Sequence, residues 1–275
     1  MSAIRRHPAL AAAPLIGLFV VAFLYPLVRM FQDAVLSPDF VANLSRIWEV
    51  PLYSQVLLRT LRISLLVAFA TVVIAYPLAA FIAGRPQRQR AALLALLFVP
   101  LLTSVVVRTY VWVAILRPRG VFDVLAEALG LPALDGALYQ NDIAVLIGMV
   151  HLMTPFAALP LYAGFLRLDP ELRPAAASLG AGRFSQWRRI VLPLTMPTIV
   201  AASVLVFVTS LGFVITPAIL GGPRGVMLGV LVSNQMASNN VSFAALLSAL
   251  LLVTTLVALG ALRVAVGRFR AMGLL

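Results

Sequence analysis

Residues 143–166 read IAVLIGMVHLMTPFAALPLYAGFL, and no charged side chain interrupts them. A helix of roughly 20 apolar residues crosses the hydrocarbon core of a bilayer, so this stretch predicts a transmembrane helix. Comparable stretches recur on both sides of it. We therefore predict an all-α polytopic membrane protein, with one transmembrane domain over residues 1–275 and six spans at about 9–31, 60–84, 91–116, 143–166, 197–220 and 242–263.

The composition agrees with a membrane location and excludes several classes of protein. Of the 275 residues, 62% are hydrophobic and only 11% are charged, whereas a soluble domain is about half apolar and about a quarter charged. Cysteine is absent, so the chain has no disulfide and no thiolate metal site. The two histidines, His7 and His151, are far apart in sequence. We expect no metal site, no cofactor and no enzymatic activity.

All 21 basic residues are arginine. A phosphate-binding loop of the Walker A type needs a lysine, so any ATP hydrolysis must come from another subunit.

The arginines predict the orientation in the membrane. If the N-terminus lies inside, the inside segments are 1–7, 85–90, 167–189 and 263–275. They carry 13 arginines and two carboxylates, a net charge of +11 out of the total +12. The positive-inside rule then predicts that both termini are cytoplasmic. Because these arginines are spread over short loops between spans, we do not expect nucleic-acid binding.

Within the predicted spans there is no aspartate or glutamate. Ion-coupled carriers usually hold an ionisable group at membrane depth, so this absence disfavours a secondary carrier. Arg108 is the exception among the charges. It is either a pathway or subunit-interface residue, or an arginine that reaches the outer headgroups. His151, near Thr154 in the fourth span, is predicted to be a hydrogen-bonded packing residue, with a role in the pathway as the alternative.

A polar cluster lies between the last two spans, in residues 225–240, which include Ser233, Asn234 and Gln235. It predicts either a loop or a short element that dips in from the surface.

The longest predicted inside loop, residues 167–197, reads RLDPELRPAAASLGAGRFSQWRRIVLPLTMP. A short helix is predicted from Pro170 or Pro174, ending near Gly180, where glycine suits a left-handed cap. Apolar Phe184, Trp187 and Val191 follow at helical spacing among arginines. This pattern is also typical of a connector that lies at the membrane interface.

This loop resembles the permeases of ATP-binding-cassette importers, whose cytoplasmic loop before the penultimate span has the pattern E-A-A-x-x-x-G-x9-I-x-L-P. The spacing is kept here, with Pro174 in place of the glutamate; the matching residues are Ala175, Ala176, Gly180, Ile190, Leu192 and Pro193. Stretches 60–79, 99–116, 159–181 and 210–222 are similar to the spermidine/putrescine-type permeases. The resemblance covers about residues 57–222.

The resemblance implies a type I importer fold and a coupling loop that docks onto an ATPase. It implies Pro174, Ala175, Ala176, Leu179, Gly180 and Ala181 as docking residues, with Ile190, Leu192 and Pro193 completing the motif. The implied partners are a dimer of cytoplasmic ATPase subunits, a second permease subunit (as a heterodimer) and a periplasmic solute-binding protein, in a bacterial inner membrane.

The substrate that this resemblance implies is a polyamine, or a related amine or amino-acid derivative. However, no carboxylate in the predicted spans neutralises a polycation, and Arg108 opposes one. Two other functions stay open from the residues alone: an ion-coupled carrier, and a non-transporting membrane scaffold.

Overall fold

The computed structural model describes residues 8–130, 132, 136–223 and 225–271, and every regular element in these ranges is a helix. The predicted inside segment 1–7, with His7, lies outside the described residues. The helices of the first half are α1 (Pro8–Val35), α2 (Phe40–Glu49), α3 (Pro51–Ala83), α4 (Gln87–Phe98), η1 (Val99–Leu102), α5 (Val105–Leu116) and α6 (Val121–Ala128). Those of the second half are α7 (Asp142–Leu166), α8 (Leu172–Ser178), α9 (Arg183–Gln186), η2 (Trp187–Val191), α10 (Leu192–Leu211), α11 (Ile215–Leu220), α12 (Leu228–Ala237) and α13 (Val241–Ala271).

The chain divides into two compact units. Unit 1 comprises residues 1–54 and 231–253, and unit 2 comprises residues 55–230 and 254–275. Within unit 1, the edge of the Tyr53 ring packs against the buried ring of Phe243, with the ring centroids 5.2 Å apart. The Arg46 guanidinium lies 5.1 Å from the centroid of the Phe243 ring. These contacts join α2, the start of α3 and the start of α13.

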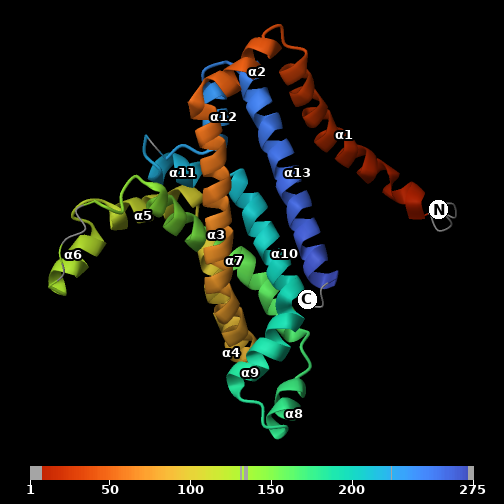
Figure 1. The fold of residues 1–275 in the computed structure, drawn as a ribbon, viewed down its shortest axis with the longest axis vertical. Helices are drawn as coiled ribbons and strands as arrows, with labels where there is room; N and C mark the ends of the chain where they lie inside the picture. The colour runs from red at the N-terminus through yellow and green to blue at the C-terminus, as the bar shows by residue number, and fades with distance from the viewer. Residues whose placement is uncertain (1–7, 131, 133–135, 224, 272–275) are drawn as a thin grey trace. The chain divides into compact units, whose positions relative to one another are not determined.

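Small residues form much of the core of unit 2. Ala75 and Ala79 of α3, Ala157 of α7 and Ala202 of α10 are fully buried in one cluster. Residues without bulky side chains let membrane helices approach closely, where no hydrophobic effect drives them together. Figure 1 shows α3, α7 and α10 of this unit running alongside one another, with α8 and α9 at the lower end of α10.

The close crossing between α7 and α10 depends on Gly164. A Cβ atom on Gly164 would lie 2.7 Å from Thr198 Cγ2, which is closer than real Cβ contacts come. The Thr198 hydroxyl itself is held by the Thr195 carbonyl at 2.7 Å. The threonine therefore has little freedom to move away.

Among the described residues, five helices are long and apolar enough to cross a membrane, and their candidate spans are Gly17–Val35, Pro51–Ala83, Asp142–Leu166, Arg183–Leu211 and Val241–Ala261. The bent helix pair Gln87–Leu102 and Val105–Ala128 adds a sixth span if the two helices together form one crossing, and the total then equals the predicted six.

The prediction of one continuous span at 91–116 was wrong. The segments Gln87–Leu102 and Val105–Ala128 meet at 92°. Pro100 has no N–H for the helical ladder, and the chain passes through the short 3₁₀ helix η1. Both the backbone N–H and the hydroxyl of Thr103 donate to the Pro100 carbonyl, at 3.2 and 2.7 Å. The polar groups freed by the break are thus partly satisfied within the chain.

The fifth predicted span, 197–220, also needed correction. The helix α10 begins earlier, at Leu192, and ends at Leu211 with Gly212 as its cap. A separate helix, α11, then turns toward α5, where the hydroxyls of Thr109 and Thr216 hydrogen-bond at 3.1 Å, fully buried. A glycine followed by the Thr216–Pro217 pair breaks the helix although the residues stay apolar.

The polar segment 225–240 contains helix α12, which decides between the two predicted alternatives in favour of a short helical element. The N–H of Leu228 has no partner inside its helix, and it donates to the Thr60 hydroxyl at 2.8 Å in a buried contact. Helices α2 and α6 and the early start of α3 at Pro51 were not predicted.

Replacing Gly164 with alanine is expected to destabilise the protein by about 1–3 kcal/mol, because the new methyl group overlaps Thr198. Thermal unfolding of the purified chain in detergent measures this change. Gly260→Ala is the matched control. No atom lies within 4 Å of the place where its Cβ would be, so this substitution is expected to leave the stability equal or slightly higher. Equal melting temperatures for the two variants would contradict the close crossing.

Candidate functional site

The connecting segment between α7 and α10 is built around the capped helix α8. After α8 ends, the Gly180 N–H donates to the Ala177 carbonyl and the Ala181 N–H donates to the Ala176 carbonyl, both at 3.0 Å. These two bonds, with Gly180 at φ +81°, form a Schellman motif. The predicted short helix and its glycine cap are therefore confirmed. A residue with a side chain would be strained at this φ.

The tip of this segment exposes apolar side chains. Leu179 is 88% exposed and Phe184 is 71% exposed, although both are large hydrophobic residues. All described residues of α8 are at least partly accessible. We name Leu172–Phe184 the coupling tip. Of the predicted docking residues, Pro174, Ala175, Leu179 and Gly180 are exposed on it, and Ala176 and Ala181 are half-buried.

Behind the tip, a buried glutamine braces the chain. The Gln186 side-chain amide donates to the Ala181 carbonyl at 2.7 Å, and the Gln186 N–H donates to the Gly182 carbonyl at 3.0 Å. Residues 187–191 then form a single π-helical turn that leads directly into α10. Such turns are rare and occur often at functional sites. The segment is thus one continuous hydrogen-bonded structure from α8 to α10.

An aromatic junction fixes the base of this segment to the spans. The Tyr76 hydroxyl of α3 hydrogen-bonds the buried Thr195 hydroxyl of α10 at 3.0 Å. The Tyr76 ring also contacts Phe165 of α7 and Trp187 of the π turn, with centroids 5.0 and 6.5 Å away. We call these four residues the aromatic junction. It joins three helices of unit 2 to the coupling tip.

The remaining motif residues lie at the start of α10. Ile190 is half-buried in the π turn, and Leu192 and Pro193 begin α10. The Leu192 N–H donates to the Trp187 carbonyl, and Pro193, which has no N–H, comes directly after this π turn. The sequence interpretation named Trp187 only as part of an apolar face, and it missed Tyr76 and Thr195. The sequence around Tyr76 and Thr195 gives no sign of their contact, because the two residues are distant in the chain and meet only in the folded structure.

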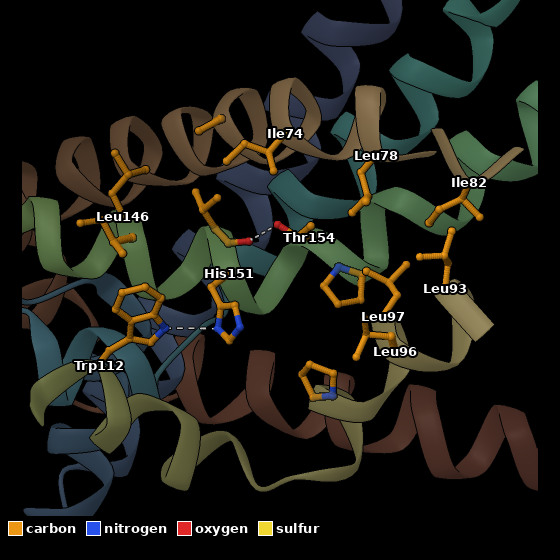
Figure 2. Close-up of a pocket in the computed structure, with 15 residues that line it drawn as sticks. Ile74, Leu78, Ile82, Leu93, Leu96, Leu97, Trp112, Leu146, His151 and Thr154 are labelled. Carbon is orange, nitrogen blue, oxygen red and sulfur yellow. Dashed lines mark hydrogen bonds between the residues drawn. The ribbon is translucent and has the colours of Figure 1, made fainter. Parts of the chain in front are cut away.

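A second group of predicted residues borders a cavity of about 670 Å³ between α3, α4, α5 and α7. Figure 2 shows Trp112 and His151 pointing toward each other at its edge, with Thr154 on the same helix as His151. The Trp112 ring N–H donates to His151 Nδ1 at 3.2 Å. The Thr154 hydroxyl donates to the Val150 carbonyl at 2.7 Å. His151 is hydrogen-bonded, as predicted, but it is exposed, so the choice between a packing residue and a role in the pathway stays a prediction. The rest of the wall is mainly apolar.

Arg108 lies one helical turn before Trp112 and is partly buried. Its Nε–H is buried and has no hydrogen-bond partner among the described residues. Neither predicted setting of Arg108 is established by these contacts, so its role stays a prediction.

Apolar helices long enough to cross a membrane, with a capped helix in the segment that connects two of them, define a polytopic membrane protein. A family model described as "Binding-protein-dependent transport system inner membrane component" matches residues 75–270. The chain belongs to this family, and it is a permease subunit of an ATP-binding-cassette importer in the inner membrane.

Relatives of known name agree with this assignment. The chain is 34% identical to the spermidine/putrescine transport system permease protein PotB of Escherichia coli (strain K12) over 193 residues, which is 70% of each protein. It is 33% identical to PotB of Haemophilus influenzae over 77% of this chain and 74% of the relative. It is also 31% identical to the inner membrane ABC transporter permease protein YdcU of Escherichia coli (strain K12), over 78% of this chain and 73% of the relative.

Among solved structures, a bacterial alginate ABC transporter in complex with an alginate pentasaccharide-bound periplasmic protein contains a similar chain. The TM-score is 0.74, at 21% sequence identity, and the match covers 93% of both chains. At this identity the similarity shows the fold alone.

Replacing Tyr76 with phenylalanine removes the hydroxyl that meets Thr195. Thr195 keeps its bonds to the Val191 and Leu192 carbonyls. We therefore expect the free energy of unfolding to fall by only about 0.5–1.5 kcal/mol. Tyr76→Ala also removes the ring contacts, and a larger loss is expected. Thermal unfolding compares both with Tyr110→Phe, whose ring is exposed. A Tyr76→Ala melting temperature equal to that of Tyr110→Phe would contradict the junction.

Proposed function

We propose that this permease subunit docks a separate cytoplasmic ATPase through the coupling tip and imports a small solute delivered by a periplasmic binding protein. The complete importer then contains two ATPase subunits and a second permease subunit, as a heterodimer. Both termini of this chain are cytoplasmic. The substrate is a polyamine, or a related amine or amino-acid derivative.

The observation that carries the docking proposal is the exposure of Leu179 and Phe184 on a rigid scaffold. Large apolar side chains that are exposed together mark an interaction site. The Schellman cap fixes where Leu179 points, since it holds the helix end and the following turn. Docking onto a pre-organised tip costs less conformational entropy than docking onto a flexible loop.

The arginine distribution supports the cytoplasmic location of this tip. Two predicted inside segments, 85–90 and 167–189, meet at one end of unit 2, because Gly84 and Arg90 line the same cavity as Asp169 and Arg173. The other end of the unit joins predicted outside residues: Arg59 of α3 pairs with Asp142 of α7 at 3.3 Å. The positive-inside rule then assigns the arginine-rich end to the cytoplasm.

Motion of the ATPase reaches the spans through the aromatic junction. When the ATPase dimer closes on ATP, the docked tip moves, and the continuous structure from α8 to α10 carries this movement. The junction transmits it to α3 and α7 through Tyr76 and Phe165. Packed elements transmit displacement because they switch between discrete arrangements rather than deform.

The substrate class rests on the relatives named for spermidine and putrescine transport. The 670 Å³ cavity has no carboxylate in its wall, and its neighbour Arg108 is positive. We therefore assign selection of the polyamine to the binding protein and the second permease. Equilibrium binding of spermidine and putrescine to the binding protein encoded with this chain tests the class, and the absence of binding would overturn it.

Leu179→Ser is expected to weaken ATPase association by about 2 kcal/mol, or roughly 30-fold, because it truncates the most exposed apolar anchor of the tip. Solute uptake by the reconstituted importer is expected to fall in parallel. Leu129→Ser is the matched control, since Leu129 is 74% exposed at the end of α6, away from the tip. Unchanged ATPase co-purification with Leu179→Ser would contradict docking at the tip.

Gly180→Val tests the cap itself. A β-branched residue in the left-handed conformation costs about 1–2 kcal/mol, so the end of α8 is expected to unwind, with reduced ATPase co-purification and uptake. Gly212→Val is the control, because Gly212 lies outside the coupling tip, has φ −89° and has open space around its Cβ position. If uptake survives loss of the ATPase but collapses with the membrane potential, the chain is an ion-coupled carrier instead. If the ATPase binds and no solute enters, the chain is a scaffold.

A further inference from the structure

A second cavity, of about 530 Å³, lies behind the coupling tip. Its wall combines the end of α3 (Ala83 and Gly84), the end of α7 (Phe165 and Leu166) and the start of α8 (Leu172 and Arg173). Both α3 and α7 are long enough to span a bilayer, and both end here. The cavity is therefore at the depth of the lipid headgroups.

The charged groups of this cavity favour an anion. Arg90 donates through Nη2 to the Ala83 carbonyl at 2.9 Å and to the Arg85 carbonyl at 3.1 Å, so its guanidinium is held in place at the end of α3. Its Nε–H is buried and has no hydrogen-bond partner among the described residues. Arg173 faces the cavity from α8. The one carboxylate in the wall, Asp169, accepts the Glu171 N–H at 2.9 Å.

The rim of the cavity is apolar and open. Leu166, Leu172 and Leu194 line it, and these side chains remain 47%, 37% and 52% exposed. A free phosphate ion has no apolar surface to bury against this rim, so the leucines would add nothing to its binding. A molecule with an anionic head and a hydrocarbon tail satisfies both parts, since the head meets the arginines and the tail covers the leucines.

We propose that this cavity binds an anionic phospholipid of the cytoplasmic leaflet. The phosphate accepts hydrogen bonds from Arg90 and Arg173, and an acyl chain lies on the three leucines. Basic pockets between membrane helices on the cytoplasmic side are known to bind such headgroups. The bound lipid contacts both α8 and the ends of the spans, so it stiffens the link between the coupling tip and the membrane domain. Trp187 lines the same cavity and reports on its occupant.

The experiment uses the purified full-length chain in lipid nanodiscs, with Trp48→Phe and Trp112→Phe leaving Trp187 as its one tryptophan. Fluorescence quenching is measured with phosphatidylglycerol brominated near the headgroup end of its acyl chains, and with phosphatidylcholine brominated in the same way. We expect stronger quenching by phosphatidylglycerol. Because an arginine that meets an anionic headgroup contributes about fivefold to the preference, Arg173→Gln, which removes such a group from the cavity wall, is expected to reduce the preference by that factor.

Arg189→Gln is the matched control, because Arg189 is exposed on the same connecting segment but does not line the cavity. It is expected to retain the preference of the parent chain. Equal quenching by the two lipids would overturn the proposal, as would equal effects of the two substitutions. Loss of the preference on adding millimolar inorganic phosphate would assign the site to a free anion and overturn the lipid assignment.

Discussion

Every backbone polar group at membrane depth must find a partner within the protein, and this constraint shapes each break in the spans. Threonine hydroxyls supply two of the partners. Thr60 accepts the free N–H at the start of α12, and Thr103 donates to the Pro100 carbonyl at the break between η1 and α5. Where α11 meets α5, the hydroxyls of Thr109 and Thr216 satisfy each other. At these breaks the threonine hydroxyls act as the hydrogen-bond partners that water would provide outside the membrane, and they stabilise the interrupted helices.

Hydrogen-bonded side chains also connect the spans to the coupling tip, the proposed docking surface for the ATPase. Thr195 bonds its own helix and also meets Tyr76, so one hydroxyl joins α10 to α3. The π turn, the Gln186 brace and the Schellman cap extend this order outward to Leu179. A movement imposed on the tip therefore has a hydrogen-bonded and packed path into the membrane domain.

The sequence predicted the features that local physics determines. Uncharged stretches predicted the helical membrane fold, and Gly180 predicted the cap of α8. It did not predict where apolar stretches bend, because the residues 91–116 and 197–220 stay hydrophobic across their breaks. Nor did it find Tyr76 as an anchor, since its partners Thr195 and Trp187 come from distant parts of the chain. Contacts between residues far apart in the sequence determine both the positions of these bends and the role of Tyr76.

The most direct test of the account follows the coupling tip and α10 together. Because the chain has no cysteine, spin labels are readily placed at Ser178→Cys, which is exposed on α8 and is not a docking residue, and at the exposed Leu205→Cys of α10. Pulsed electron spin resonance then measures the distance between the labels in the assembled importer, without nucleotide and with ATP trapped. The account predicts the same distance distribution in both states, because the tip and α10 move as one body. A clear shift or broadening with ATP would contradict it.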